Sequence, residues 1–86
     1  MEKIEERARW LIDEHQIPFS FDELAGKHRG GGLADARHKV MFELKILFGY
    51  SYPQIGKLFN RNHTSVIHAV QKVRKARGVE PEVGPY

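Results

Sequence analysis

Apolar residues recur at helical spacing in five stretches of the chain, and no stretch alternates apolar and polar residues as a half-buried strand does. The first stretch, residues 2–15, has an apolar stripe at Ile4, Ala8, Leu11 and Ile12. Acidic residues in its first turn suit the helix dipole, and we expect the helix to end before Pro18. Ser20 and Glu23 have the spacing of a capping box, which predicts a short second helix ending at Gly26 with Phe21 and Leu24 inward.

The third and fourth apolar stretches predict a central helix followed by a short one. Residues 34–48 have the clearest helical stripe in the chain, formed by Val40, Met41, Leu44, Leu47 and Phe48. We expect this segment to be the core helix and to end at Gly49. Ser51 and Gln54 again have capping-box spacing, so a short helix is predicted over residues 51–59. Its inward side chains are expected to be Ile55, Leu58 and Phe59.

The fifth stretch predicts a last helix that Asn62 caps and that ends near Arg77, with Gly78 behind it. Its inner side carries Val66, Ile67, Val70 and Val73. The fold class expected is therefore all-α: a small helical bundle over residues 1–77, containing a helix-turn-helix at about 51–77. We expect the tail, residues 78–86, to be disordered. The larger aromatic side chains are expected in the core: Trp10, Phe42, Phe48 and Phe59.

Charge is distributed unevenly along the 86 residues, although the formal net charge is only +3. Residues 1–26 contain three Lys or Arg and seven Asp or Glu, whereas residues 27–77 contain eleven and two. A cationic block of this kind favours a polyanionic partner such as nucleic acid, with a solvated charged face as the alternative. The absence of cysteine excludes disulfides. Neither a secretory leader nor a membrane-spanning run is visible, so we expect a cytoplasmic, nucleoid-associated location.

The residues at the start of the last helix are suited to reading DNA. In a helix-turn-helix the first turn of the second helix meets base edges in the major groove. Asn can pair with adenine, the Thr methyl group can contact the thymine methyl group, and His or Ser can donate or accept hydrogen bonds. That turn contains Asn62, His63, Thr64 and Ser65. A polar stripe opposite the valines continues along the outer face of the helix through Thr64, His68, Gln71 and Lys75.

Other interpretations of these residues are possible. Asn62 can serve as a helix cap alone. His63 and His68 are five residues apart and do not share a helix face, so we expect no metal site. Ser65 and His68 lack a carboxylate to orient the histidine, so we expect no catalytic residue. The basic end of the last helix, Lys72, Arg74, Lys75 and Arg77, can be a solubilising terminus. Residues 27–32, KHRGGG, lack the spacing of a nucleotide-binding loop, and no cofactor is expected.

Residues 36–73 carry a family resemblance. The segment ARHKVMFELKILFGYSYPQIGKLFNRNHTSVIHAVQKV resembles the C-terminal DNA-binding domain (domain IV) of the bacterial chromosomal replication initiator DnaA. That family has a hallmark of the form Arg-Asp-His-Thr-Thr-Val followed by His-Ala, and the likeness extends from about Ile4 to Lys75. The resemblance implies a small helical bundle, related to the Trp-repressor type, that binds duplex DNA at sites of the initiator-box type.

The resemblance also implies roles for individual residues. Arg29 matches an arginine that enters the minor groove, and Pro53 matches a proline that packs against bases. The residues expected to read bases are then Arg29, Pro53, Asn62, His63 and Thr64. Those expected to contact phosphates are Lys27, Arg37, His38, Lys45, Arg61, Ser65 and His68.

Two departures from the family bear on the target sequence. Asn62 stands where the family usually has Asp, and the turn before it is one residue shorter. The expected partner is double-stranded DNA, bound by a monomer, with the full-length initiator or another replication protein as further partners. The family's ATPase module is not among these residues, so we expect no enzyme activity, in either a fragment or a standalone protein. The alternatives are a protein-interaction module, using the acidic first helix and Trp10, and a transcriptional repressor with the same helix-turn-helix.

Overall fold

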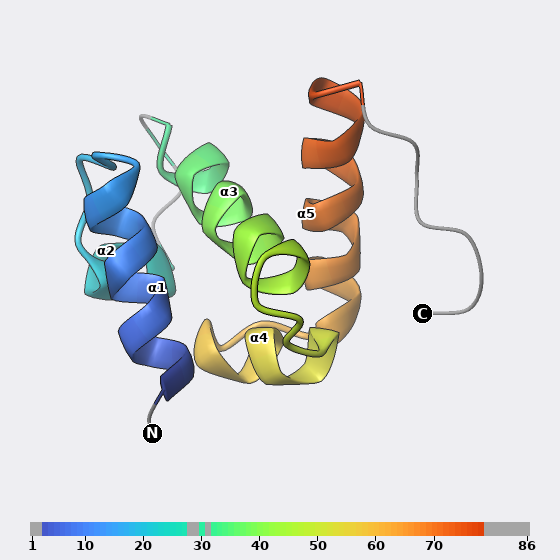
Figure 1. Cartoon of the computed structure of the whole chain (residues 1–86), viewed down its shortest axis with the longest axis horizontal. Helices are drawn as coiled ribbons and strands as arrows, with labels where there is room; N and C mark the ends of the chain where they lie inside the picture. Colours follow the sequence, from blue (N-terminus) through green and yellow to red (C-terminus); the bar gives the residue numbers. More distant parts are fainter. Residues whose placement is uncertain (1–2, 28–29, 31, 79–86) are drawn as a thin grey trace.

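A computed structural model of the chain describes residues 3–27, 30 and 32–78, and these residues form five helices without a strand. The helices are α1 (Lys3–Glu14), α2 (Phe21–Ala25), α3 (Leu33–Ile46), α4 (Tyr52–Leu58) and α5 (His63–Ala76). In Figure 1, α3 crosses the centre of the molecule, α1 and α2 lie on one side of it, and α5 lies on the other. Helix α4 runs across the foot of α3 and α5 (Figure 1). The all-α helical bundle with a helix-turn-helix, predicted from the sequence, is confirmed.

Capping boxes set the beginnings of two helices, α2 and α4. The Ser20 hydroxyl accepts from Glu23 N while the Glu23 carboxylate accepts from Ser20 N, which forms the predicted capping box of α2. Ser51 and Gln54 form the same box at α4, where Pro53 lies in the first turn and needs no hydrogen-bond partner for its nitrogen. These caps satisfy backbone N–H groups that have no carbonyl partner within the helix.

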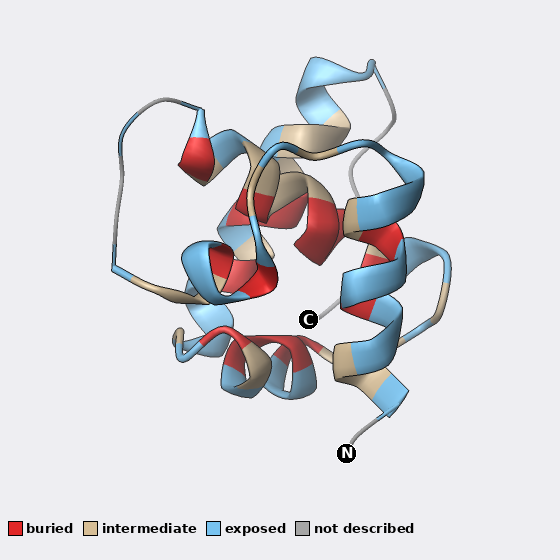
Figure 2. Ribbon diagram, turned by 90° about the vertical axis from the view of Figure 1, so that its left-hand side faces the viewer, coloured by how far each residue is buried: buried red, intermediate tan, exposed pale blue. Residues whose placement is uncertain are grey.

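The core lies where α3 meets the other helices, and Figure 2 shows the buried positions facing inward. Its fully buried large side chains are Leu11, Leu24, Val40, Met41, Leu44, Ile55, Phe59, Val66 and Val70. Ala69 belongs to the same core, although the sequence pattern did not place it there. Six of the side chains predicted to face inward are only partly buried: Ile4, Ile12, Phe48, Leu58, Ile67 and Val73.

Two core predictions are wrong, and both concern the edge where α1 meets the end of α3. Leu47 is 57% exposed because α3 ends at Ile46 and the chain turns away toward Gly49, which has a φ of +75°. Trp10 is 48% exposed, since it packs edge-on against the partly buried ring of Phe48 rather than beneath α3. The predicted tail lies almost entirely outside the described residues.

Candidate nucleic-acid interface

The first turn of α5 presents polar side chains to solvent. Asn62 has an extended backbone, and its Oδ1 atom accepts a hydrogen bond of 2.8 Å from Thr64 N, so Asn62 is the N-cap that the sequence predicts. His63, Thr64 and Ser65 follow it and are all exposed. The Asn62 amide nitrogen is the remaining donor on that side chain, which leaves the cap compatible with a base contact.

The turn between α4 and α5 is tight because two backbone segments touch. Asn60 has a φ of +56°, and Arg61 N donates to Gly56 O at 2.8 Å. A Cβ atom placed on Gly56 would lie 2.6 Å from Arg61 O, so only glycine fits here without a shift of the backbone. Gly56 was not singled out from the sequence. Its signal was a glycine inside a short, otherwise regular helix, which often marks such a close approach.

A cationic hollow lies beside the start of α5. It has a volume of about 450 Å³ and is lined by Lys27, Arg37, His38, Asn60, Arg61 and Ser65. Five of these six side chains were predicted to contact phosphates; the exception is Asn60. The six residues come from the end of α2, from α3, from the turn between α4 and α5, and from α5 itself. The fold therefore brings together, in one hollow, residues that are separated by up to 38 positions in the sequence.

Two arginines of this hollow already have backbone partners. Arg37 is 6% exposed, and its Nε atom donates to Leu24 O at 2.6 Å. Arg61 donates from Nη1 to Phe59 O at 2.7 Å and from Nη2 to Gly26 O at 2.7 Å. Nη1 also lies 3.4 Å from Ala25 O. Both side chains thus have structural roles, and their contact with phosphate stays a prediction.

His38 borders the cationic hollow and a second hollow that includes Lys39 and Lys72. Its Nδ1 atom is buried and has no hydrogen-bond partner within the described part of the chain. Burial lowers the pKa of the imidazole below its usual value; Lys72, Arg37 and Arg61 add to this shift, whereas Asp35 opposes it. His38 therefore tends to be neutral in the free protein.

The remaining predicted contacts lie on other elements. Lys45, near the end of α3, is partly exposed, with Nζ 4.5 Å from the centre of the Tyr52 ring. Pro53 is exposed in the first turn of α4, and His68 is exposed on α5. Arg29, the predicted minor-groove residue, lies outside the described residues. Lys27, two positions before it, is exposed at the rim of the hollow.

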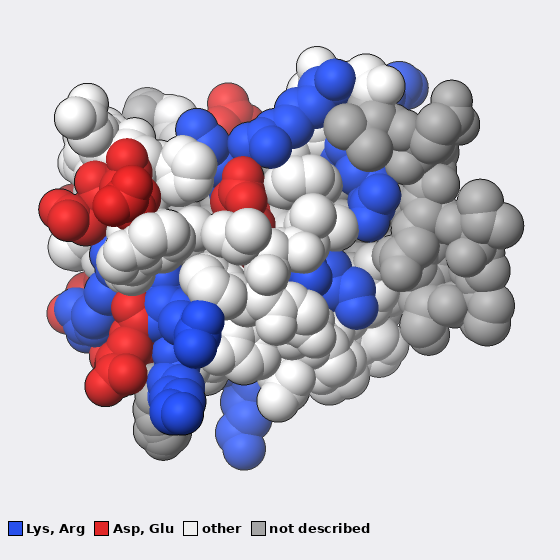
Figure 3. Space-filling model, in the orientation of Figure 1, with Lys and Arg blue, Asp and Glu red and all other residues white. Residues whose placement is uncertain are grey.

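Most of the acidic side chains visible in Figure 3 lie on one side of the bundle, whereas basic side chains are visible on both sides. On the face shown in Figure 3, the main group of acidic side chains lies at the left, on the side of α1, while basic side chains also cover the upper part of α3 and α5. At the end of α5 one cation is neutralised, because Arg77 Nη2 lies 3.2 Å from the Glu43 carboxylate. At the basic end of α5, Arg77 therefore contacts α3 through this ion pair instead of adding an unpaired charge to the surface.

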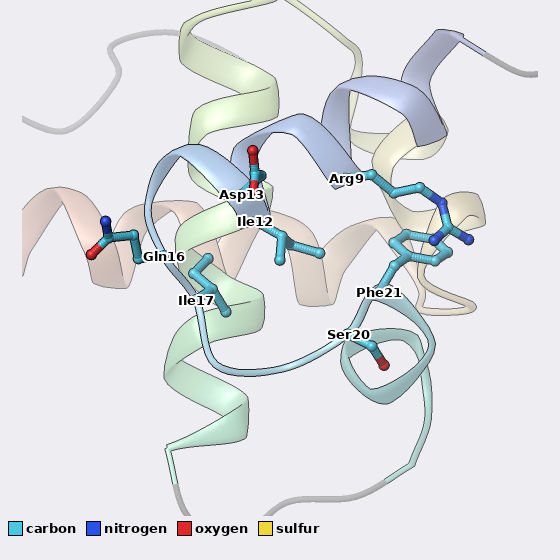
Figure 4. A pocket seen from close by; sticks show the side chains of 7 residues that line it. All are labelled: Arg9, Ile12, Asp13, Gln16, Ile17, Ser20 and Phe21. Atoms are coloured by element: carbon cyan, nitrogen blue, oxygen red, sulfur yellow. The ribbon is translucent and has the colours of Figure 1, made fainter.

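A further hollow, of about 410 Å³, lies where α1 turns toward α2. Figure 4 shows Arg9 extended across the ring of Phe21, while Asp13 and Gln16 point in different directions. Arg9 is also paired with the Glu5 carboxylate at 2.8 Å. Because its polar groups do not converge, this hollow has no resemblance to a small-molecule site. Among the described residues, no group of three His, Asp or Glu could hold a metal, and no helix is long and apolar enough to span a membrane.

The comparison with known families agrees with this arrangement. Residues 14–73 match the family model described as the bacterial dnaA protein helix-turn-helix. The chain belongs to this family. The DnaA match covers the end of α1 and all of α2 to α4, and it reaches most of α5. It therefore includes both halves of the helix-turn-helix and the cationic hollow.

Several curated proteins are similar over most of the chain. The chromosomal replication initiator protein DnaA of Bordetella pertussis is 39% identical over 81 residues, or 93% of this chain. The proteins of the same description from Herminiimonas arsenicoxydans and Deinococcus radiodurans are 41% and 32% identical over 61 and 62 residues, or 70% and 72% of this chain. The chain spans only 13–17% of the length of these three relatives. No solved structure gives a significant match.

Proposed function

We propose that this chain is a non-enzymatic domain that binds double-stranded DNA sequence-specifically at sites of the initiator-box type, one copy to each site, in replication initiation or its regulation. The observation that carries the proposal is the position of the cationic hollow directly beside the exposed first turn of α5. A helix-turn-helix uses that turn to read bases in the major groove, while neighbouring cations hold the phosphate backbone. One surface thus combines both kinds of contact.

The proposed site assignments are those that the sequence and the family resemblance predict. His63 and Thr64, with Asn62, would face base edges, while Pro53 would approach bases from the first turn of α4. Arg29 would reach the minor groove. The phosphate contacts would be Lys27, Arg37, His38, Lys45, Arg61, Ser65 and His68. This arrangement is supported by the exposure of the reading turn and by the five proposed phosphate contacts around one hollow.

The direct test is fluorescence anisotropy with labelled duplexes. A duplex that contains an initiator box should bind more tightly than a scrambled duplex of the same length and composition, and the stoichiometry should be one domain to one site. Equal affinity for both duplexes, at every salt concentration, would contradict sequence-specific recognition. Selection from random duplexes would then show whether another sequence is preferred, which is relevant because Asn62 replaces the usual Asp.

Replacing His63 with alanine should weaken binding to the preferred duplex by about 1–3 kcal/mol and relax the preference at particular base pairs. The exposed imidazole is in the first turn of α5, so its removal should affect reading without affecting the core. Thr64→Ala should behave similarly. The matched control is His15→Ala, which removes an exposed imidazole beyond the end of α1. A loss of the same size on box and scrambled duplexes would make His63 a general contact.

The pH should affect the stability of the free domain and its DNA affinity in opposite directions through His38. The pKa of His38 is lower in the folded protein than in the unfolded chain, so the unfolded chain binds more protons as the pH falls below about 6.5. The contribution of His38 to the free energy of unfolding is therefore complete above that pH, and it declines as the pH falls toward the pKa of the folded state. A phosphate near His38 favours the charged form instead. Between pH 7.5 and 5.5, urea unfolding should therefore show a greater loss of stability for the wild type than for His38→Gln, and anisotropy should show a greater gain of affinity. If the DNA affinity of the two proteins depended on pH in the same way, His38 would not be part of the interface.

A second candidate function is the docking of a partner protein. It is favoured by Trp10, which is 48% exposed in a surface hollow that it lines with Glu6, Arg7 and Phe48. If the chain bound duplex DNA with no salt dependence, this surface would become the better candidate for the main function.

A further inference from the structure

We propose that Arg37 and Arg61 are positioning residues that fix the end of α2, and with it Lys27, against the turn of the helix-turn-helix. This inference rests on the proposed function, since its consequence is the geometry of the DNA-binding surface. It adds a second role to the phosphate contact proposed above for these arginines, because here their partners are backbone carbonyl oxygens of the same chain. We call the set of contacts between these two side chains and the end of α2 the arginine clamp.

The clamp is built on three consecutive carbonyl groups, those of Leu24, Ala25 and Gly26. The last carbonyl groups of a helix have no amide partner within it, and the partial negative charge of a helix end makes them good acceptors for cations. Arg37 donates to the first of them at 2.6 Å, from α3. Arg61 reaches the other two, at 3.4 and 2.7 Å, from the turn between α4 and α5. Helix α2 is therefore closed by side chains from two distant parts of the chain.

Arg61 is held on its own side of this contact as well. Its backbone N–H donates to Gly56 O at 2.8 Å, and its Nη1 atom donates to Phe59 O at 2.7 Å. The guanidinium thus joins the end of α4 to the end of α2. The flat guanidinium group has five N–H donors in a fixed geometry, which allows one side chain to reach several carbonyl groups. A lysine has the same charge but cannot reproduce this set of contacts.

The clamp has a direct consequence for the cationic hollow. Lys27 follows Gly26, whose carbonyl group Arg61 holds, while Ser65, which also lines the hollow, is in the first turn of α5. The contact of Arg61 with Gly26 O therefore sets where Lys27 lies relative to the first turn of α5 before any DNA is bound. A surface arranged in advance does not lose binding free energy to ordering these groups on association.

The test compares Arg61→Lys with Arg61→Ala. The matched control is Arg7→Lys, because Arg7 is an exposed arginine on α1 that lies over Phe48. All proteins are compared at a temperature at which circular dichroism shows full helix content. Arg61→Lys retains the charge but loses the contacts with the carbonyl groups. If Arg61 is a positioning residue, this variant should bind DNA about tenfold more weakly than the wild type, with an unchanged salt dependence. Arg7→Lys should bind as the wild type does. If Arg61→Lys binds like the wild type and Arg61→Ala only lowers the salt dependence, Arg61 is a phosphate contact without a positioning role, and the proposal is wrong.

A double-mutant cycle with Lys27→Ala gives a readout that general destabilisation would not change. If Arg61 sets the position of Lys27, then Lys27→Ala should weaken binding much less in the Arg61→Lys background than in the wild type. Additive losses would overturn the proposal. The cycle is measured by anisotropy on the same duplex at one salt concentration.

Limited trypsin digestion of the free domain tests the clamp without DNA. Cleavage after Lys27 should become faster in both Arg61→Lys and Arg37→Lys, relative to cleavage after Lys45 in the core helix, because the end of α2 is released locally. Unchanged cleavage after Lys27 in both variants would overturn the clamp. A wild-type domain that binds no duplex would instead refute the proposed function, and the digestion result would still decide whether the clamp exists.

Discussion

Raising the salt concentration from 50 to 200 mM is expected to weaken binding to a duplex by roughly a thousandfold. Of the seven proposed phosphate contacts, all but Ser65 have a basic side chain, and about five or six such contacts correspond to a log–log slope of very roughly −5. The cations that would displace counterions lie in the cationic hollow and at Lys45. Anisotropy titrations of one duplex at four or five salt concentrations measure the slope directly.

The contribution of one cation can be separated from the total. Lys45→Ala should reduce the steepness of the slope by about one and weaken binding to box and scrambled duplexes by the same factor. Lys3→Ala removes an exposed lysine from α1, outside the proposed surface, and should leave the slope unchanged. A flat salt response of the wild-type domain would rule out DNA binding as its main function and favour the docking of a partner protein.

The features that the sequence predicted correctly are those determined by neighbouring residues. The capping boxes at Ser20 and Ser51, and the Asn62 cap, depend on side chains that reach backbone atoms two or three residues away. The stripe of apolar residues on α3 likewise predicted that Val40, Met41 and Leu44 would be buried. Because these interactions are local, the spacing of residues was sufficient to identify them.

The errors and omissions concern contacts between distant segments. A helical stripe assigns Leu47 to the same face as Leu44, but α3 ends before it and the turn at Gly49 leads the chain away. The basic residues Arg37 and Arg61 were predicted to contact phosphates, and this stays a prediction. Their carbonyl partners at the end of α2 were not predictable, since they lie 13 and 35 to 36 positions away in the sequence.

The candidate site shows the same division. The polar first turn of α5 follows from the cap and from the apolar stripe on the opposite side of the helix. The packing of α2, α3 and α5 around a common core brings three distant residues to the border of one hollow: Lys27, His38 and Ser65. The spacing of residues in the sequence does not show this. The charges along the sequence indicated a cationic region over residues 27–77. Only the fold shows which of these cations lie close together.

Replacing Gly56 with alanine should destabilise the domain by about 3 kcal/mol. Helix propensity alone predicts the opposite sign, because alanine is favoured over glycine inside a helix by about 1 kcal/mol. Here, however, the added methyl carbon would lie 2.6 Å from Arg61 O, which is a backbone atom that cannot move without shifting the turn. The sign of the change in the free energy of unfolding, measured by urea denaturation, therefore distinguishes the close approach from simple propensity.

The matched control is Gly30→Ala, because a Cβ atom at Gly30 would have no neighbour within 4 Å. Its unfolding free energy should stay close to that of the wild type. For Gly56→Ala, a shift of the turn would also displace Arg61 and Asn62, so the protein that remains folded should bind the box duplex less tightly and discriminate less against the scrambled one. Increased stability with normal discrimination would show that the turn accommodates a side chain at this position, and that the short connection between α4 and α5 does not depend on glycine.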